Sequence, residues 1–199
     1  MFQQVLKLCL KMNNLFSELE EKITFLEDIC FDEKKIQEFI LEEIKKKLGA
    51  SENKGFAFEE IVYDFFEYMN IPLIKTPKTR DGGFDGFVNF NIGFLGEIKL
   101  GLQIKYSLID STDIDSFLTA LKNAELQLGV VVCKDSRNLS KYELNSKIKS
   151  ILLSRGISLK EKLLGEKIDI NPVFVLKLNE IVEIISSQIR SFIKSVYKK

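Results

Sequence analysis

The chemistry open to this chain is limited by what its sequence leaves out. The 199 residues include no histidine, and the three cysteines (Cys9, Cys30 and Cys133) lie far apart without metal-ligand spacing. Serine–histidine–aspartate triads, cysteine–histidine pairs and histidine-bound zinc are therefore excluded. Any chemistry must use carboxylates, lysines, amides or a hard metal ion, and we expect the cysteines to be buried free thiols.

Three polar side chains of these types fall on two predicted strands. Asp85 lies in one segment of alternating apolar residues, 84–90, and Gln103 and Lys105 lie in a second, 98–106. If the turn between the strands is centred near residue 94, paired residue numbers sum to about 188 and Asp85 lies opposite Gln103. Side chains two apart share a face, so Gln103 and Lys105 project together, roughly 7 Å apart at their Cα atoms. The hairpin thus gathers a carboxylate, an amide and an ammonium on one side of a sheet.

A plainer interpretation of the same pattern is an ordinary half-exposed sheet. In that case Gln103 and Lys105 merely face solvent, while the other parity of the strand supplies the buried face through Leu100, Leu102, Ile104 and Tyr106. On Gln103 and Lys105 alone, the two interpretations are equally good.

The elements that must position these residues follow from apolar periodicity. Residues 2–48 look helical, with a second helix at 32–48 that Gly49 ends in the left-handed conformation, and a third helix follows at 55–69. After the hairpin, the pattern predicts a helix at 112–126, a strand at 129–133, a helix at 140–155, a strand at 173–176 and a helix at 179–198. This order predicts an α/β fold in which helices flank both faces of a mixed sheet, with an N-terminal helical extension.

With the elements in place, the sequence resembles a known family. The segment RDGGFDG (80–86) followed by QIK (103–105) is similar to the motifs of the Mrr-like branch of the PD-(D/E)xK nucleases. Upstream, FEEIVYDFFEYM (58–69) resembles the family's first core helix, and downstream LGVVVCK (128–134) and FVLKLNEIVEII (174–185) resemble its later strands and final helix. The resemblance covers about residues 54–199 and implies a restriction-endonuclease-like catalytic domain there, with residues 1–50 as a helical extension outside it.

The resemblance also implies the site residues, which are Glu59, Asp85, Gln103 and Lys105. Asp85, the side-chain oxygen of Gln103 and the backbone carbonyl of Ile104 would bind Mg²⁺, for which Mn²⁺ can substitute, because oxygen ligands suit a hard cation. Lys105 would orient or help to deprotonate the attacking water, and Glu59 would hold water near the metal, or an ammonium, from the helix side. Gln103 replaces the acid of many relatives, which favours one-metal over two-metal catalysis.

A competing Glu-x-Lys lies earlier on the second strand. Glu97–Ile98–Lys99 is closer to the usual consensus of the superfamily. Its pairing with Asp85 would centre the turn at residue 91, fold the chain there too tightly, and bury little of the later apolar residues beside the site. We therefore prefer Gln103 and Lys105, and the register of the hairpin decides between the two pairs.

The composition indicates where the protein acts and what kind of partner it binds. Apolar residues make up 45% and charged residues 29%, a soluble globular balance. No apolar run approaches the roughly 18 residues of a membrane-spanning helix, and the first residues lack a signal-peptide pattern. We expect a cytoplasmic protein with no membrane partner. The net charge is zero, but residues 134–199 hold 14 basic and 7 acidic residues, which suits a phosphate-rich partner.

Together, these observations and the resemblance favour a magnesium-dependent endonuclease of double-stranded DNA. It would be type II or type IV restriction-like and would act in restriction or defence against foreign DNA. A homodimer is the simplest way for one site per chain to cut both strands. Two alternatives stay open: a non-catalytic DNA-binding or assembly subunit that retains the fold, and a structure-selective repair or junction nuclease.

Overall fold

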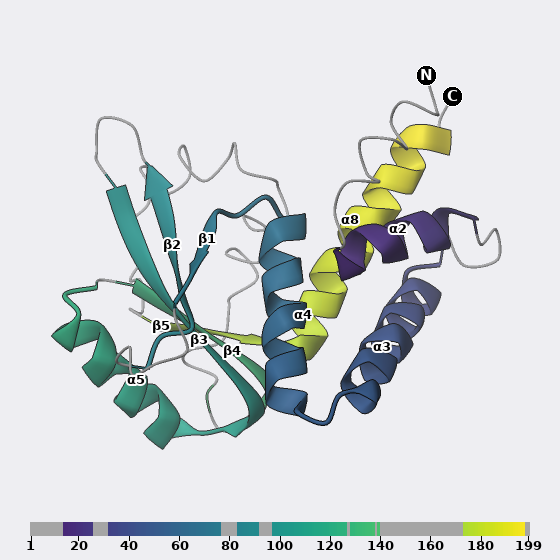
Figure 1. Ribbon diagram of the computed structural model, residues 1–199. Coiled ribbons are helices and arrows are strands. Elements are labelled where there is room, and N and C mark those ends of the chain that lie inside the picture. Colours follow the sequence, from purple (N-terminus) through teal and green to yellow (C-terminus); the bar gives the residue numbers. More distant parts are fainter. Residues whose placement is uncertain are drawn as a thin grey trace.

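A five-stranded mixed sheet forms the centre of the molecule (Figure 1). In the computed structural model, residues 14–25, 32–76, 83–91, 97–126, 128–137, 139 and 173–197 are described. The strands run in the order β1 (Leu73–Lys75), β2 (Gly86–Asn91), β3 (Glu97–Ile109), β4 (Leu128–Ser136) and β5 (Val173–Lys177). β1, β2 and β3 are antiparallel neighbours, whereas β4 and β5 continue the sheet in parallel to β3. The predicted mixed sheet is confirmed.

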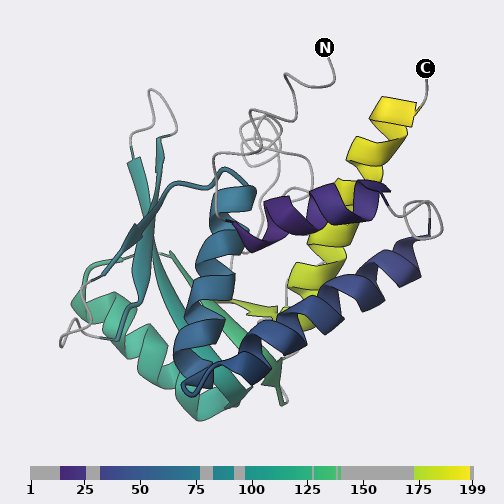
Figure 2. The same ribbon diagram turned by 45° about the vertical axis from the view of Figure 1, so that its right-hand side comes forward.

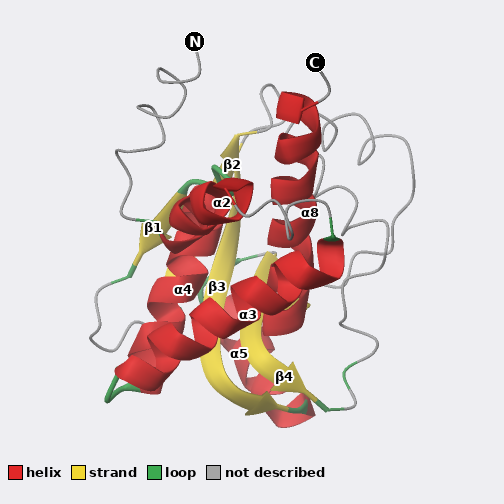
Figure 3. Ribbon diagram, turned by 90° about the vertical axis from the view of Figure 1, so that its right-hand side faces the viewer, coloured by secondary structure: helices red, strands yellow, loops and turns green. Residues whose placement is uncertain are grey.

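Helices cover both faces of this sheet, as the order of elements predicted. α5 (Ser111–Asn123) lies on one face, and α4 (Lys54–Tyr68) and α8 (Leu178–Tyr197) lie on the other (Figure 1). α2 (Leu15–Phe25) and α3 (Glu33–Ala50) form an outer pair that contacts α4 and α8 (Figures 2 and 3). None of the described helices is long and apolar enough to cross a membrane.

Strand β3 separates two apolar cores because its side chains alternate between the faces of the sheet. Leu100, Leu102 and Ile104 are buried in the larger core, with α4, α8 and the two outer helices. Gly101, between them, faces the smaller core under α5, where a Cβ atom would lie 2.6 Å from the ring of Phe84. By the same alternation, Gln103 and Lys105 project on the α5 side. The strand thus fixes which face each site residue occupies.

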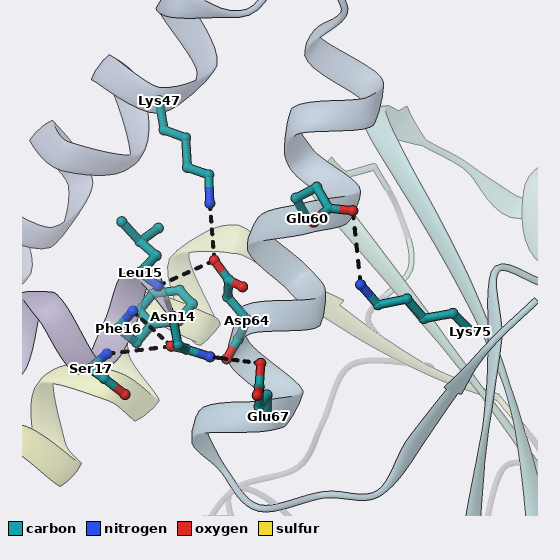
Figure 4. A network of polar contacts seen from close by, with 9 residues as sticks. All are labelled: Asn14, Leu15, Phe16, Ser17, Lys47, Glu60, Asp64, Glu67 and Lys75. Atoms are coloured by element: carbon teal, nitrogen blue, oxygen red, sulfur yellow. Dashed lines mark hydrogen bonds and ion pairs between the residues drawn. The ribbon is translucent and has the colours of Figure 1, made fainter. Parts of the chain in front are cut away.

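The N-terminal helices are joined to α4 by polar contacts as well as by apolar packing. Asp64 of α4 accepts hydrogen bonds from the Lys47 ammonium at 3.0 Å and from the Leu15 backbone N–H at 3.3 Å (Figure 4). The Asn14 side chain donates to the backbone carbonyl of Asp64 at 2.8 Å. One acidic residue therefore anchors both outer helices. The apolar stripes of α2 and α3 belong to the same core as α4 and α8, while the predicted boundary at residues 50–54 stays a prediction.

The ends of the described elements lie within a few residues of the predicted ones, with two differences. The left-handed ending at Gly49 is wrong: α3 runs through Gly49 to Ala50 and ends because Ser51 adopts an extended conformation (φ −95°, ψ 132°). That extended segment leads to Asn53, whose side chain caps α4. β1 was not predicted, because three residues are too few to display alternation. The predicted helix at 140–155 and the helical start at 2–13 lie outside the described residues.

α5 packs so closely on β4 that Gly129 leaves no room for a side chain. A Cβ atom at Gly129 of β4 would lie 2.5 Å from the Phe117 ring and 2.8 Å from the Leu121 side chain. We expect Gly129→Ala to lower the free energy of unfolding by about 1–3 kcal/mol through overpacking. The matched control is Gly49→Ala, where nothing lies within 4 Å, and a helical alanine should raise stability by about 0.5 kcal/mol. Urea denaturation measures both, and equal stability of the two variants would contradict the packing.

Candidate active site

The β2–β3 ladder begins at Gly86, directly after Asp85, and its register can be compared with the predicted one. Gly86 pairs with Leu102, and the pairing continues to Asn91 opposite Glu97, so paired residue numbers sum to 188. The predicted register is confirmed. The competing register is wrong, because Glu97 lies opposite Asn91 at the far end of β2 and Lys99 lies opposite Asn89.

The backbone of Asp85 is held by three separate elements. Its N–H donates to the carbonyl of Leu102 in β3 at 2.8 Å. Its carbonyl accepts from the backbone N–H of Thr76, directly after β1, at 3.2 Å, and from the Tyr63 hydroxyl of α4 at 3.0 Å. Gly83, two residues earlier, has φ +92°, a conformation that favours glycine. A turn at Gly83 therefore precedes Asp85, and hydrogen bonds to three parts of the fold hold the backbone of Asp85.

The carboxylate of Asp85 takes the place of a backbone group in the ladder. Its Oδ2 accepts a hydrogen bond from the Ile104 backbone N–H at 2.6 Å. In this register, a regular antiparallel ladder would pair that N–H with the carbonyl of Phe84. The Phe84 carbonyl instead accepts from the Thr76 hydroxyl at 2.6 Å. Because the side chain of Asp85 completes the ladder, its position is set by the sheet itself.

Gln103 presents an oxygen for which the described part of the chain supplies no hydrogen-bond partner. Its Nε2 donates to the carbonyl of Gly83 at 2.9 Å, which fixes the orientation of the amide. The other end, Oε1, is buried without a hydrogen-bond partner. A buried acceptor left in this way costs about 1–3 kcal/mol and is a feature of functional sites. Gln103 is therefore half-buried, with an exposed hydrogen bond at Nε2 and a covered oxygen at Oε1.

The oxygen atoms around Asp85 suit a hard divalent cation. Strand residues direct their N–H and C=O groups toward the same neighbour, so the carbonyl of Ile104 lies on the side of the Asp85 carboxylate. Together with the Oε1 of Gln103, these groups are carboxylate, amide and carbonyl oxygens, the donor types that Mg²⁺ accepts. No group of three acidic or cysteine side chains that could hold a metal occurs among the described residues. The amide and the carbonyl would therefore have to complete the ligand set, and the unpartnered oxygen of Gln103 is consistent with that.

Lys105 follows on the same face, and its ammonium is held in place. Nζ lies 2.5 Å from Oδ1 of Asp113, in the first turn of α5. This pairing holds the pKa of the Asp113 carboxyl below its ordinary value of 3.8, chiefly through the hydrogen bond from Lys105. The side chain of Lys105 is 32% exposed, so it is not simply solvated.

Cys133 lies next to Lys105 in the sheet but is not suited to chemistry. It pairs in register with Lys105 and is fully buried, and burial raises the pKa of its thiol to about 12. Such a thiol stays protonated at neutral pH, and the thiolate is the form that acts as a nucleophile. The predicted buried free thiol is confirmed for Cys133, whereas Cys9 and Cys30 lie outside the described residues.

Glu59 reaches this region from the other side of the sheet. It is half-buried on α4, one helical turn before Tyr63, whose hydroxyl contacts the carbonyl of Asp85. Residues four apart lie on one side of a helix, so Glu59 shares the side of Tyr63. α4 packs against the Leu102 and Ile104 face of β3, opposite the face of Gln103 and Lys105. The structure therefore joins Asp85 to Ile104 by a hydrogen bond and Gln103 to Gly83, two residues before Asp85, and it places Glu59 on a helix at the other face of the sheet.

The sequence did not single out three supporting residues, which are Tyr63, Thr76 and Asp113. Tyr63 and Thr76 hold the backbone of Asp85, and Lys75 lies over the ring of Tyr63, 4.1 Å from its centroid, while pairing with Glu60 at 3.9 Å (Figure 4). Asp113 pairs with Lys105. Only Asp113 has a local signal, the capping-box spacing from Asp110 at the start of α5.

More than half of the chain matches the model of a known protein family. Residues 50–163, or 114 of the 199, match a family model described as "Restriction endonuclease" (Mrr_cat). No curated protein matches the chain. The restriction-endonuclease-like fold that the resemblance implied is confirmed by the family match.

Two solved structures are similar to this chain. The first is described as the DNA modification-dependent restriction endonuclease AspBHI, with 16% identity, a TM-score of 0.46, and coverage of 82% of this chain and 40% of that one. The second is described as MspJI restriction endonuclease in complex with a 27-mer oligonucleotide, with 13% identity, a TM-score of 0.36, and coverage of 83% and 36%. This chain thus spans about two fifths of the length of each.

The bond between the Asp85 carboxylate and Ile104 predicts how two substitutions differ. Asp85→Ala leaves the N–H of Ile104 without its acceptor, and we expect the free energy of unfolding to fall by about 1–2 kcal/mol. Asp85→Asn keeps an oxygen at the same place and should recover most of that loss. Thermal and urea unfolding without divalent metal measure both variants. An Asp85→Ala protein as stable as the wild type would show that the carboxylate does not complete the ladder in solution.

Proposed function

The chain belongs to the restriction endonuclease family, and from this premise we propose that it is a magnesium-dependent endonuclease that hydrolyses phosphodiester bonds in DNA. The observation that supports the proposal most is the arrangement at the start of β2. There the carboxylate of Asp85 is fixed on the backbone of Ile104, and Gln103 offers a buried oxygen without a partner. This is an oxygen-donor site of the kind that a phosphate-cleaving metal requires.

Asp85, Gln103 and Ile104 would hold the metal through their carboxylate, amide and carbonyl oxygens. Bound Mg²⁺ would supply positive charge to the scissile phosphate as negative charge develops on it. Because Gln103 is neutral, the ligand set contributes one carboxylate where an acid at position 103 would make two. The lower negative charge favours binding one metal ion over binding two.

Lys105 and Glu59 would act on the water and the phosphate. An ammonium has three N–H donors, and Lys105 gives one to Asp113, which leaves two for the attacking water and a phosphate oxygen. Donors aimed at developing charge in a preformed site contribute strongly to catalysis. Glu59, from α4, would hold water or an ammonium on the opposite side of Asp85.

The substrate and assembly that we propose are double-stranded DNA and a homodimer. One site per chain cuts one strand, so two chains related by twofold symmetry place a site on each strand. Restriction or another defence against foreign DNA, of type II or type IV character, is the role that fits a member of this family. We place this activity in the cytoplasm, where such DNA is met.

Cleavage assays test the activity itself. Purified protein should convert methylated or unmethylated supercoiled plasmid to cut forms in Mg²⁺ or Mn²⁺, and chelation should stop the reaction. We expect Asp85→Asn to lower the cleavage rate by at least about 100-fold, because the variant weakens metal binding and charge stabilisation. Mg²⁺ should also raise the melting temperature of the wild type more than that of Asp85→Asn.

Two outcomes would assign the alternatives instead. DNA binding with a steep salt dependence, but no cutting in any methylation context with either metal, would indicate a non-catalytic DNA-binding subunit. Cleavage confined to branched DNA would indicate a structure-selective nuclease.

A comparison of two lysines tests which of them serves the site. We expect Lys105→Ala to reduce cleavage by about 100-fold or more, and Lys99→Ala to stay within about twofold of the wild type, since Lys99 is exposed and lies over the ring of Phe87. Plasmid cleavage at saturating DNA measures both, and circular dichroism checks that both fold. Normal activity of Lys105→Ala would refute the assignment.

A further inference from the structure

The ion pair between Lys105 and Asp113 is built into the start of α5. One oxygen of the Asp113 carboxylate, Oδ1, accepts from the Lys105 ammonium at 2.5 Å. The other, Oδ2, accepts from the backbone N–H of Asp110 at 3.1 Å. Both oxygens of one carboxylate are thus engaged, one by the helix and one by the lysine.

The helix itself fixes where that carboxylate lies. Asp110 is the N-cap of α5, and its side chain accepts from the Thr112 N–H at 2.9 Å, so that Asp110 and Asp113 form a capping box. α5 begins directly after β3, whose pairing with β4 shifts between Lys105 and Leu108. The first turn of α5 lies beside Lys105, where Asp113 contacts its ammonium. In an ordinary capping box the third residue only reaches back to the N-cap, whereas here it also holds a lysine.

We propose that Asp113 is a positioning residue for Lys105: its carboxylate, held by the backbone N–H of Asp110, orients the ammonium that acts on the phosphate. This inference rests on the proposed nuclease function. A lysine side chain has four rotatable bonds, and leaving them free would spread the ammonium over many positions. A carboxylate fixed at both oxygens restricts the ammonium to one region of the site before DNA binds. Pre-organisation of this kind contributes to the rate, not to the affinity for DNA.

A purely structural role for Asp113 predicts a different result. If Asp113 serves only as a helix cap, its loss and the loss of the Asp110 cap should have the same consequences. Asp110→Ala is therefore the matched control, because it removes a cap from the same helix but leaves the backbone N–H of Asp110 and the carboxylate of Asp113 in place.

Kinetics with full-length protein separate the two roles. We expect Asp113→Asn, which keeps the shape and loses the charge, to lower kcat for plasmid cleavage by about 10–100-fold with KM within about twofold. Asp113→Glu should recover part of the rate. Asp110→Ala should lower the melting temperature and keep kcat within about twofold. In a Lys105→Ala background, Asp113→Asn should cause no further loss, since the two residues act as a unit. Wild-type kcat in Asp113→Asn, or a further loss in the double variant, would overturn the proposal.

A second measurement does not depend on cleavage. The pKa of the Asp113 carboxyl, followed by carbon NMR, should lie below 3.8 in the wild type and rise when Lys105 is replaced in Lys105→Met. The sign follows from the pairing: the ammonium stabilises the ionised carboxylate, so the pair is intact above this pKa and is lost as the pH falls through it. An unchanged pKa in Lys105→Met would overturn the pair itself.

A wild-type protein that binds but never cuts DNA would overturn both the nuclease activity and the positioning role. The titration of Asp113 would then still report whether the pair exists, so the failure of the function and the failure of the pair are told apart.

Discussion

The hydrogen bond between the carboxylate of Asp85 and the backbone N–H of Ile104 is the constraint on which the rest of the site depends. The side chain of Asp85 accepts the hydrogen bond that a backbone carbonyl would accept in a regular ladder. The sheet therefore determines where the negative charge of this carboxylate lies. The backbone of Asp85 is in turn fastened to β3, to the residue after β1 and to α4. A carboxylate held in this way has little conformational freedom to lose when it binds a cation. The backbone positions of Gln103 and Ile104 are fixed as well, because both residues belong to β3, the strand that Asp85 contacts.

Much of this arrangement was predictable because one face of β3 is apolar. Leu100, Leu102 and Ile104 must point into the core, and a shift of one residue would expose all three. That requirement fixed the face on which Gln103 and Lys105 lie, and a turn centred near residue 94 then set the hairpin register. The apolar stripes of the helices were readable for the same reason, since a period of three to four residues persists over many turns.

The remaining parts depend on contacts between distant segments, or on elements too short to form a pattern. Tyr63 and Thr76 reach Asp85 from separate elements, and nothing near either residue in the sequence indicates a partner. β1 is three residues long. The prediction that α3 ends at Gly49 was wrong. Glycine often ends helices, but here the extended conformation of Ser51 ends α3. Asp113 is different: its spacing from Asp110 is a readable helix start, but its second contact, with Lys105, depends on how β3 ends.

The N-terminal helices and α8 share one apolar core with α4, and this core extends beyond the region that matches the family model. The family match spans residues 50–163, yet the apolar side of α4 is covered by α2, α3 and α8, which lie outside that span. The region matched by the family model is therefore smaller than the apolar core to which α4 belongs. A fragment cut to the similar region would expose the buried side of α4, including the residues next to Tyr63, and would loosen the support of Asp85 from behind. In this chain, helices outside the matched region therefore support the residues of the candidate site.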